Sequence, residues 1–208
     1  MGQRLTAELL RRGHTVRTLV RAGSEKKVPP GAAPMPGNPL DETSYASAVA
    51  PADTFVHLIG VTHPNPSKAA QFRAIDGASA KAAIAAAVQA HVEHFIYLSV
   101  AQPAPVMQAY IAVRAECEKA LRDSGLNATI IRPWYVLGPG RQWPYLLAPI
   151  YWILEKIPAT REGAQRLGLA TIVQMTAALA SAVENPARGV RIWGVPEIRK
   201  GKDAPFPS

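Results

Sequence analysis

Apolar residues near the start of the chain change from helical spacing to a continuous run. Leu5 and Leu9 lie on one face of a helix, and the following run from His14 to Val20 is rich in β-branched residues. Gly13 stands between them and is typical of a helix end. The pattern predicts a helix over residues 4–10, a glycine turn and then a strand.

The same order of helix and strand repeats along the rest of the chain. Further helices are expected at residues 41–50, 69–90, 109–124 and 170–184, further strands at 54–61, 94–100, 128–132 and 190–195, and a proline-rich loop at 29–39. Such alternation predicts an α/β fold in which helices cover both faces of a parallel sheet. One feature is unusual, because a doubly wound sheet normally opens with a strand and this chain opens with a helix.

Length and composition predict one globular domain. The 208 residues are 48% hydrophobic and 18% charged, which is enough to bury a core. The formal charge of +8 would attract phosphates, anionic cofactors, nucleic acid or acidic membrane surfaces. The basic residues are scattered without interleaved aromatic residues, so we expect no specific nucleic-acid site.

The cysteine and the histidines argue against a disulfide framework and a metal centre. Cys117 is the single cysteine, and the histidines show no zinc-type spacing with cysteine or acidic partners. The N-terminus has no apolar signal region, and no long uncharged apolar run follows it. We expect a cytoplasmic protein. The apolar, aromatic stretch Trp143–Leu154 is too short to span a bilayer, and leaves open a contact with a partner or with the surface of the inner membrane.

Several motifs resemble those of a known superfamily. Met1–Gly2 and the sequence RLTAELLRRGH that begins at Arg4 are similar to the end of the G-x-x-G-x-x-G loop and the first helix of extended and atypical short-chain dehydrogenases/reductases. This group includes epimerase-like, NmrA-like and complex I 39-kDa-subunit-like proteins. The resemblance implies a Rossmann-like doubly wound sheet over residues 1–208 that lacks its usual first strand, with Gly2 as the third loop glycine. We therefore expect a true start about 10–15 residues upstream, enough for one strand and its loop.

The resemblance also implies cofactor-binding residues. Arg21 follows the family's second strand, where a basic residue grips the 2′-phosphate of NADP; an ordinary surface arginine, with NAD as cofactor, is the alternative. Asn38 lies in a segment similar to the loop near the adenine. Leu58, Ile59 and Gly60 resemble the loop after the fourth strand, where a glycine lets the backbone approach the cofactor.

The predicted catalytic residues follow the next strand. Ser99 occupies the place of the family's substrate-orienting serine, and Tyr110 with Arg114 occupies the place of its Tyr-x-x-x-Lys. The four-residue spacing puts both side chains on one helix face. In the family the lysine lowers the pKa of the tyrosine, so Arg114 in its place leaves a structural role for this pair as the alternative.

The most specific match is the segment from Ser124 to Gly140, which contains Pro133 and Val136. It resembles the family's sixth strand and the loop beside the nicotinamide. Residues of about 141–170 are then expected to form a small, variable substrate or partner region. Two functions follow: an NAD(P)-dependent oxidoreductase or epimerase-like enzyme, or a non-catalytic NAD(P)-binding redox sensor or assembly protein of the NmrA-like or complex I accessory-subunit type.

Overall fold

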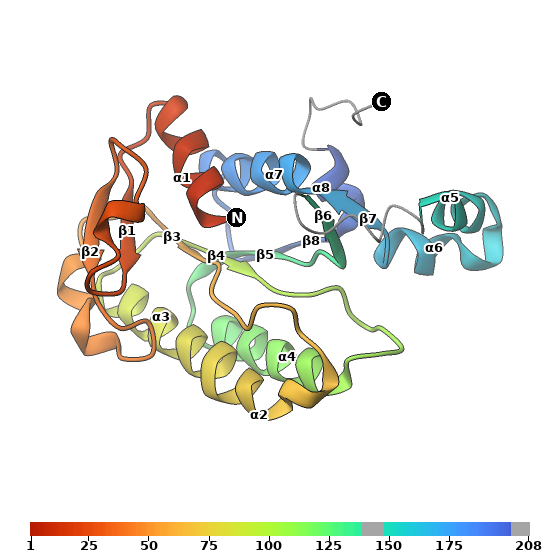
Figure 1. Ribbon diagram of the computed structural model, residues 1–208, viewed down its shortest axis with the longest axis horizontal. Helices are drawn as coiled ribbons and strands as arrows, with labels where there is room; N and C mark the ends of the chain where they lie inside the picture. Colours follow the sequence, from red (N-terminus) through yellow and green to blue (C-terminus); the bar gives the residue numbers. More distant parts are fainter. Residues whose placement is uncertain (139–147, 201–208) are drawn as a thin grey trace.

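The main sheet has four parallel strands in the order β3-β4-β5-β8 (Figure 1). The computed structural model describes residues 1–138 and 148–200. The four strands are β3 (Thr54–His57), β4 (His94–Leu98), β5 (Asn127–Ile131) and β8 (Val190–Trp193). Neighbouring strands in this order are joined through helices, as parallel pairing requires. The predicted α/β class with a Rossmann-like parallel sheet is therefore confirmed.

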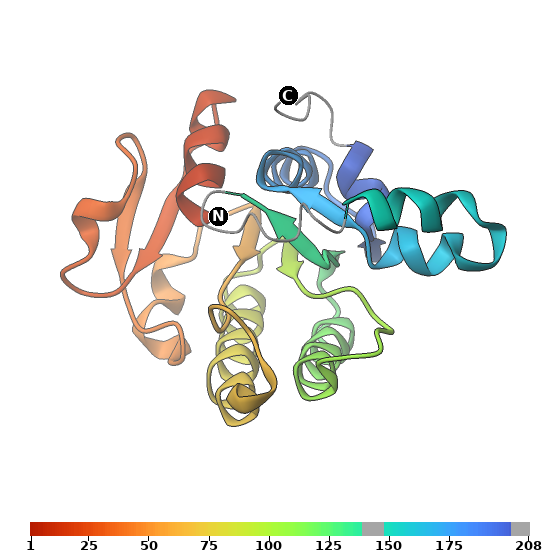
Figure 2. The same cartoon turned by 45° about the vertical axis from the view of Figure 1, so that its right-hand side comes forward.

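Helices cover both faces of this sheet (Figures 1 and 2). One face carries α1 (Gly2–Arg11) and α7 (Ile172–Glu184), and the other carries α3 (Ala78–Gln89) and α4 (Gln108–Asp123). Side chains of β4 alternate between the two layers: Phe95 and Tyr97 pack with α3 and α4, whereas Ile96 packs with α1 and α7. Burial on both faces explains why the strands read as continuous apolar runs.

A second, two-stranded piece of parallel sheet lies beside the main one. It consists of β1 (Arg17–Val20) and β2 (Ala33–Pro36). The prediction of a loop over residues 29–39 was wrong at residues 33–36, which form β2. The Ala33 amide donates at 2.9 Å to the carbonyl of Val16, directly before β1, and the Gly37 amide donates at 2.9 Å to the carbonyl of Val20 at the end of β1. Pro34 and Pro36 therefore take the alternate positions, whose nitrogens point away from β1. A strand with a partner on one side only tolerates proline there.

The two pieces of sheet share no ladder within the described residues. β1 pairs with β2 alone, and β3 pairs with β4 alone. Leu19 of β1 and Phe55 of β3 nevertheless contact the same apolar cluster, and α1 packs across the other face. The described elements thus match the expected fold without its first strand, since α1 precedes every strand that the structure describes.

Two predicted helices differ in detail from the structure. The helix expected at 69–90 is continuous but consists of α2 (Ala69–Gln71), a π-helical turn η5 (Phe72–Gly77) and α3. The helix expected at 41–50 consists instead of the 3₁₀ turns η2 (Glu42–Ser44) and η3 (Ala46–Ala48). The side chain of Asp41 caps η2 by accepting from the Thr43 amide.

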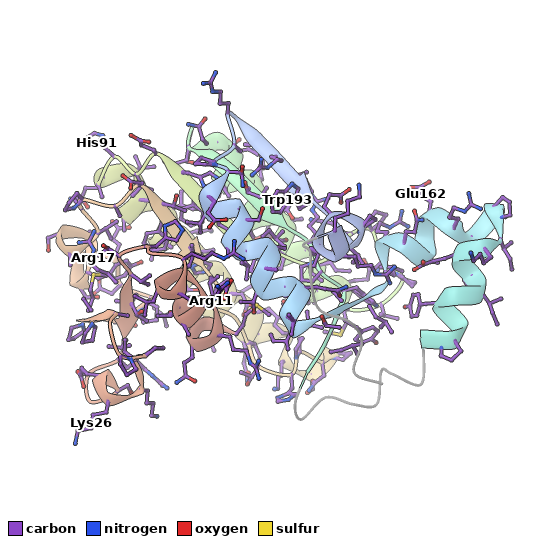
Figure 3. The ribbon with its side chains drawn as sticks, turned by 90° about the horizontal axis from the view of Figure 1, so that it is seen from above. Arg11, Arg17, Lys26, His91, Glu162 and Trp193 are labelled. Carbon is purple, nitrogen blue, oxygen red and sulfur yellow. The ribbon has the colours of Figure 1, made fainter. Side chains whose placement is uncertain are left out.

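The C-terminal part adds further short elements. They are β6 (Tyr135–Leu137), α5 (Ala148–Lys156), α6 (Pro158–Arg166), β7 (Leu169–Thr171) and α8 (Val195–Lys200). The N-terminal part contains two further 3₁₀ turns, η1 (Glu25–Lys27) and η4 (Pro66–Lys68). Figure 3 shows Glu162 of the α5–α6 hairpin at the opposite end from Arg17 and Lys26. Among the described residues no helix combines the length and apolar character that crossing a membrane demands.

Candidate cofactor site

The carboxyl edge of the main sheet collects most of the predicted site residues. Because β3, β4 and β5 are parallel, the segments that follow them meet at this edge. These segments begin with Leu58, Ser99 and Arg132, and α4 lies beside them with Tyr110 and Arg114. Ligands of open α/β sheets bind at this edge.

Arg114 lies inside the protein and joins two strand ends. Its side chain is only 5% exposed, and its Nη2 lies 2.5 Å from Oδ1 of Asp76. Nη1 donates to the carbonyl of Leu98 at the end of β4 at 2.8 Å, and Nη2 donates to the carbonyl of Ile59 after β3 at 3.5 Å. The arginine is therefore buried beside Tyr110 and bound to other groups of the protein.

Arg114 keeps its charge in this setting. Burial by itself lowers the pKa of Arg114, but Tyr97, Tyr110 and Asp76 hold it above its ordinary value. A permanently charged guanidinium cannot pass a proton. Its carbon Cζ lies 5.1 Å from the centre of the Tyr110 ring, a cation–π distance, and Phe72 packs on the same tyrosine. The predicted common helix face thus exists, with the charge over the ring.

Gly60 is needed for the packing of this ion pair. A Cβ on Gly60 would lie 2.2 Å from Nη2 of Arg114 and 2.9 Å from Oδ1 of Asp76. The next amide, that of Val61, donates to Oδ2 of Asp76 at 2.9 Å. The sequence suggested that a glycine here serves the approach of a cofactor, and the structure adds a reason within the protein itself.

Ser99 is bound to a second buried charge on α4. Its hydroxyl donates to Oε1 of Glu118 at 2.6 Å, and Gln102 Nε2 donates to the same oxygen at 2.8 Å. Arg132, which follows β5, donates to both carboxylate oxygens of Glu118. One carboxylate thereby ties the segment after β4 to the segment after β5.

The Glu118 carboxylate is ionised although its side chain is only 1% exposed. Burial opposes ionisation, but hydrogen bonds from Arg132 and Ser99 hold the pKa of Glu118 below its ordinary value. Because the Ser99 hydroxyl donates its hydrogen bond to this carboxylate, the serine oxygen can act only as an acceptor toward another group. The geometry suits a ligand that donates a hydrogen bond to Ser99.

The predicted adenine side lies at the β1–β2 piece and is more open. Arg21 is exposed directly after β1. Asn38 uses its side-chain oxygen locally, as acceptor for the Leu40 amide at 3.1 Å. Gly2 begins α1, and a Cβ there would meet no atom within 4 Å. The structure does not bring these three residues into contact with Ser99 or Arg114.

The remaining predicted cofactor residues have packing roles. The carbonyl of Pro133 accepts a hydrogen bond from the Ala101 amide at 2.8 Å, so it links the segments after β5 and β4. Val136 and Leu58 pack on the apolar cluster beneath α1 and α7. Their side chains help to fix the carboxyl edge from the side opposite α4.

Two hollows lie near the predicted substrate region. The first, of about 370 Å³, borders the carboxyl edge and is lined by Gln102, Pro103, Ala104, Gln108, Ile111 and Arg132. The second, of about 710 Å³, is an open groove along α5 and α6. Arg166 lines the groove and donates to the carbonyl of Pro103 in the first hollow at 3.1 Å. This hydrogen bond connects the wall of the groove with the wall of the first hollow.

Parts of the predicted partner surface fall outside the described residues. Residues 143–147 of the stretch Trp143–Leu154 are among them, whereas Ile153 on α5 is 53% exposed. Within residues 1–138 and 148–200, no group of three or more His, Cys, Asp and Glu side chains could hold a metal ion.

The sequence interpretation missed Asp76 and Glu118. Asp76 is the single acid in an alanine-rich helical stretch, and a lone charge at a position that is otherwise buried is a signal for a partner. Glu118 stands four residues after Arg114, on the same face of α4. Their partners come from other elements, which only the tertiary structure reveals.

The residues present fit the phosphate-bearing half of a dinucleotide best. Met1 at the start of α1 makes no side-chain capping bond, so the first amides of the helix have no side-chain acceptor. An anion at a helix N-terminus is favourable, and Arg21 adds a positive charge after β1. On the nicotinamide side, in contrast, Ser99 and Arg114 are engaged with protein partners.

Comparisons with known proteins identify the family and the fold of the chain. Residues 1–142 match the family described as NAD(P)H-binding, so the chain belongs to that family. A search of curated protein sequences found no match. The prediction that the protein binds NAD(P) is thereby confirmed, without a distinction between NAD and NADP.

Solved structures with the same fold include an epimerase and a short-chain dehydrogenase/reductase superfamily protein. The enzyme WbmH of Bordetella bronchiseptica in complex with NAD⁺ is 18% identical, with a TM-score of 0.67 over 93% of this chain and 71% of WbmH. The UDP-N-acetylglucosamine 4-epimerase of Bacillus cereus is 13% identical, with a TM-score of 0.67 over 96% of this chain and 79% of the epimerase. A short-chain dehydrogenase/reductase superfamily protein of Agrobacterium tumefaciens with bound NAD is 15% identical, with a TM-score of 0.66 over 93% of this chain and 74% of that protein. This fold agrees with the predicted extended or atypical short-chain dehydrogenase type.

Proposed function

We propose that this protein is an NAD(P)-dependent oxidoreductase or epimerase-like enzyme that acts on a carbonyl or hydroxyl group. The observation that carries the proposal is the NAD(P)H-binding family match over residues 1–142, which include the carboxyl ends of β3, β4 and β5 with Ser99, Tyr110 and Arg114. A bound dinucleotide would supply hydride transfer. The protein's own residues would bind and orient both reactants, with Tyr110 as the candidate acid/base.

The cofactor in this proposal is NADP. Arg21 supports it, because an exposed guanidinium after β1 can bind a 2′-phosphate through a fork of charged hydrogen bonds. Gly2 and Asn38 would contact the adenine-bearing half, and Leu58, Ile59, Gly60, Pro133 and Val136 would line the rest of the path. NAD is the alternative.

The substrate would occupy the hollow beside the carboxyl edge. Arg132, Gln102 and Gln108 line this hollow with polar side chains that also bond within the protein, and Pro103, Ala104 and Ile111 give it an apolar wall. That lining suits a small polar molecule with oxygen acceptors. The described part of the predicted substrate region, α5 and α6, would flank it, since Arg166 connects their groove to this hollow.

A thermal shift measurement tests the cofactor assignment. A ligand of the native state raises the unfolding midpoint, so NADPH should raise it more than NADH at equal concentration. Failure of both dinucleotides to shift the midpoint would contradict the proposal. Turnover with a panel of aldehydes, ketones and sugar nucleotides then tests the enzymatic part.

A second function is favoured by the state of Arg114. Its pairing with Asp76 removes the lysine-like group that would activate Tyr110, which suits a non-catalytic NAD(P)-binding redox sensor or assembly protein. Such a protein would work in the cytoplasm, or at the inner-membrane surface, through the stretch Trp143–Leu154. Dinucleotide binding without turnover on any carbonyl substrate would favour this second function over the first.

A further inference from the structure

Two oppositely charged, buried side chains connect three elements at the carboxyl edge. Asp76 lies in the π-helical turn η5, one residue before its end, Arg114 lies on α4, and both bind the segment after β3. Asp76 uses Oδ1 for the guanidinium and Oδ2 for the Val61 amide. Arg114 adds the carbonyls of Ile59 and Leu98. The pair thus determines where the segment after β3 lies relative to β4.

Stability alone is a weak explanation for this arrangement. A buried ion pair often contributes little more than apolar residues of the same volume, because both charges lose their hydration. Here the pair also requires the absence of a side chain at Gly60, and Asp76 sits in a π-turn, an irregularity that is frequent at functional sites. Both features, the requirement for glycine at position 60 and the π-turn at Asp76, lie at the segment that a ligand at the carboxyl edge would contact.

The sheet order indicates which half of a dinucleotide the pair would affect. Arg21 and Asn38 lie at the β1–β2 piece, on one side of β3. Arg114 contacts the ends of β3 and β4, on the other side. With the adenine half at Arg21, the nicotinamide half extends over the ends of β4 and β5. The pair lies under this second half.

We propose that the Asp76–Arg114 ion pair is a positioning device, which holds the segment Ile59–Val61 in the arrangement that accepts the nicotinamide half of the cofactor. Arg114 then acts through the backbone, as a positioning residue, and not as the partner that activates Tyr110. The inference rests on the proposed binding of a dinucleotide to this site.

The test compares binding of the whole dinucleotide with binding of its adenine half. Titration calorimetry would use NADPH and adenosine 2′,5′-bisphosphate, or NADH and AMP if the wild type prefers NADH. For Asp76→Asn we expect dinucleotide affinity to fall about tenfold, as loss of a charged hydrogen bond implies, with the adenine half bound as tightly as before. A merely structural role would weaken both ligands or neither.

A matched control lies on the same two helical segments. Arg73 of η5 and Glu116 of α4 form an exposed pair at 3.4 Å, with side chains 69% and 50% exposed. Glu116→Gln should leave both affinities unchanged. Arg114→Lys keeps the charge, so it guards against misfolding of Asp76→Asn, and it should also weaken the dinucleotide selectively because one ammonium cannot replace the planar fork.

The outcomes separate the inference from the proposed function. Equal dinucleotide affinity of wild type, Asp76→Asn and Arg114→Lys would overturn the positioning role while leaving cofactor binding intact. A gain of turnover in Arg114→Lys with unchanged affinity would overturn it too, because that result assigns Arg114 to the activation of Tyr110. A wild type that binds neither dinucleotide would overturn the proposed function itself.

Discussion

The two sides of the carboxyl edge are built from opposite kinds of contact. On the β1–β2 side, Arg21 is exposed and Asn38 bonds within its own turn. On the β3–β5 side, Asp76, Arg114 and Glu118 are almost fully buried and bond between elements. The difference indicates that residues on the first side can change ligand preference without a cost in stability. On the second side, binding geometry and stability depend on the same side chains.

The largest effect is expected from Glu118→Gln. It leaves Arg132 without its charged partner and weakens the bonds from Ser99 and Gln102. Breaking a buried pair in this way should lower the free energy of unfolding by about 3 kcal/mol. Urea denaturation measures this loss in the free energy of unfolding. Glu116→Gln, on the exposed face of the same helix, should change the value by less than about 0.5 kcal/mol; equal effects would contradict the contrast between the sides.

Gly60→Ala should have the next largest effect. The added methyl group would overlap Nη2 of Arg114, so the ion pair must shift, at a cost of about 1–3 kcal/mol. Gly163→Ala in α6 is the control, because a Cβ there meets no atom within 4 Å. That change should be neutral or stabilising by up to about 1 kcal/mol, since alanine favours a helix. Both values come from urea unfolding curves.

The pH dependence of stability should reveal the buried His57 at the end of β3. Burial, with a contribution from Arg114, lowers its pKa to about 3. Below pH 6.5 the unfolded chain binds a proton that the folded protein excludes. Stability should therefore be full above pH 6.5 and fall toward pH 3, at up to about 1.4 kcal/mol per pH unit from this group.

A substitution isolates the contribution of His57. His94, whose pKa burial and Arg191 lower to about 4, acts in the same direction, so a slope will remain in its absence. His57→Gln should reduce the slope of unfolding free energy between pH 6.5 and pH 5, measured by urea unfolding at three pH values. An unchanged slope would mean that His57 is protonated in the folded state.

The smallest effect on stability is expected from Arg21→Ala. The side chain is exposed, so the unfolding midpoint should not change measurably. Its loss should instead lower the affinity for NADPH about tenfold and leave the affinity for NADH unchanged, because only NADPH carries a 2′-phosphate. Lys26→Ala, another exposed cation of the β1–β2 side, serves as the control. Equal losses for both cofactors would argue against a 2′-phosphate contact.

The sequence predicted the sheet class and most elements because periodicity reports which faces are buried. The alternation of helix and strand, the buried run of β4 and the common face of Tyr110 and Arg114 follow from local spacing. It failed at β2, where five prolines in residues 29–39 indicated a loop. Whether proline breaks a strand depends on which nitrogens face a neighbour, and that is decided by pairing with β1.

The chain by itself thus determined the α/β fold, its resemblance to dinucleotide-binding proteins and the candidate residues along the carboxyl edge. Only the tertiary structure decided what those residues do there. Asp76 and Arg114 are 38 residues apart, and Ser99 and Glu118 are 19 apart, so no local pattern pairs them. Their partners are chosen by burial, because a charge removed from water must find its counterpart wherever the fold brings one within reach.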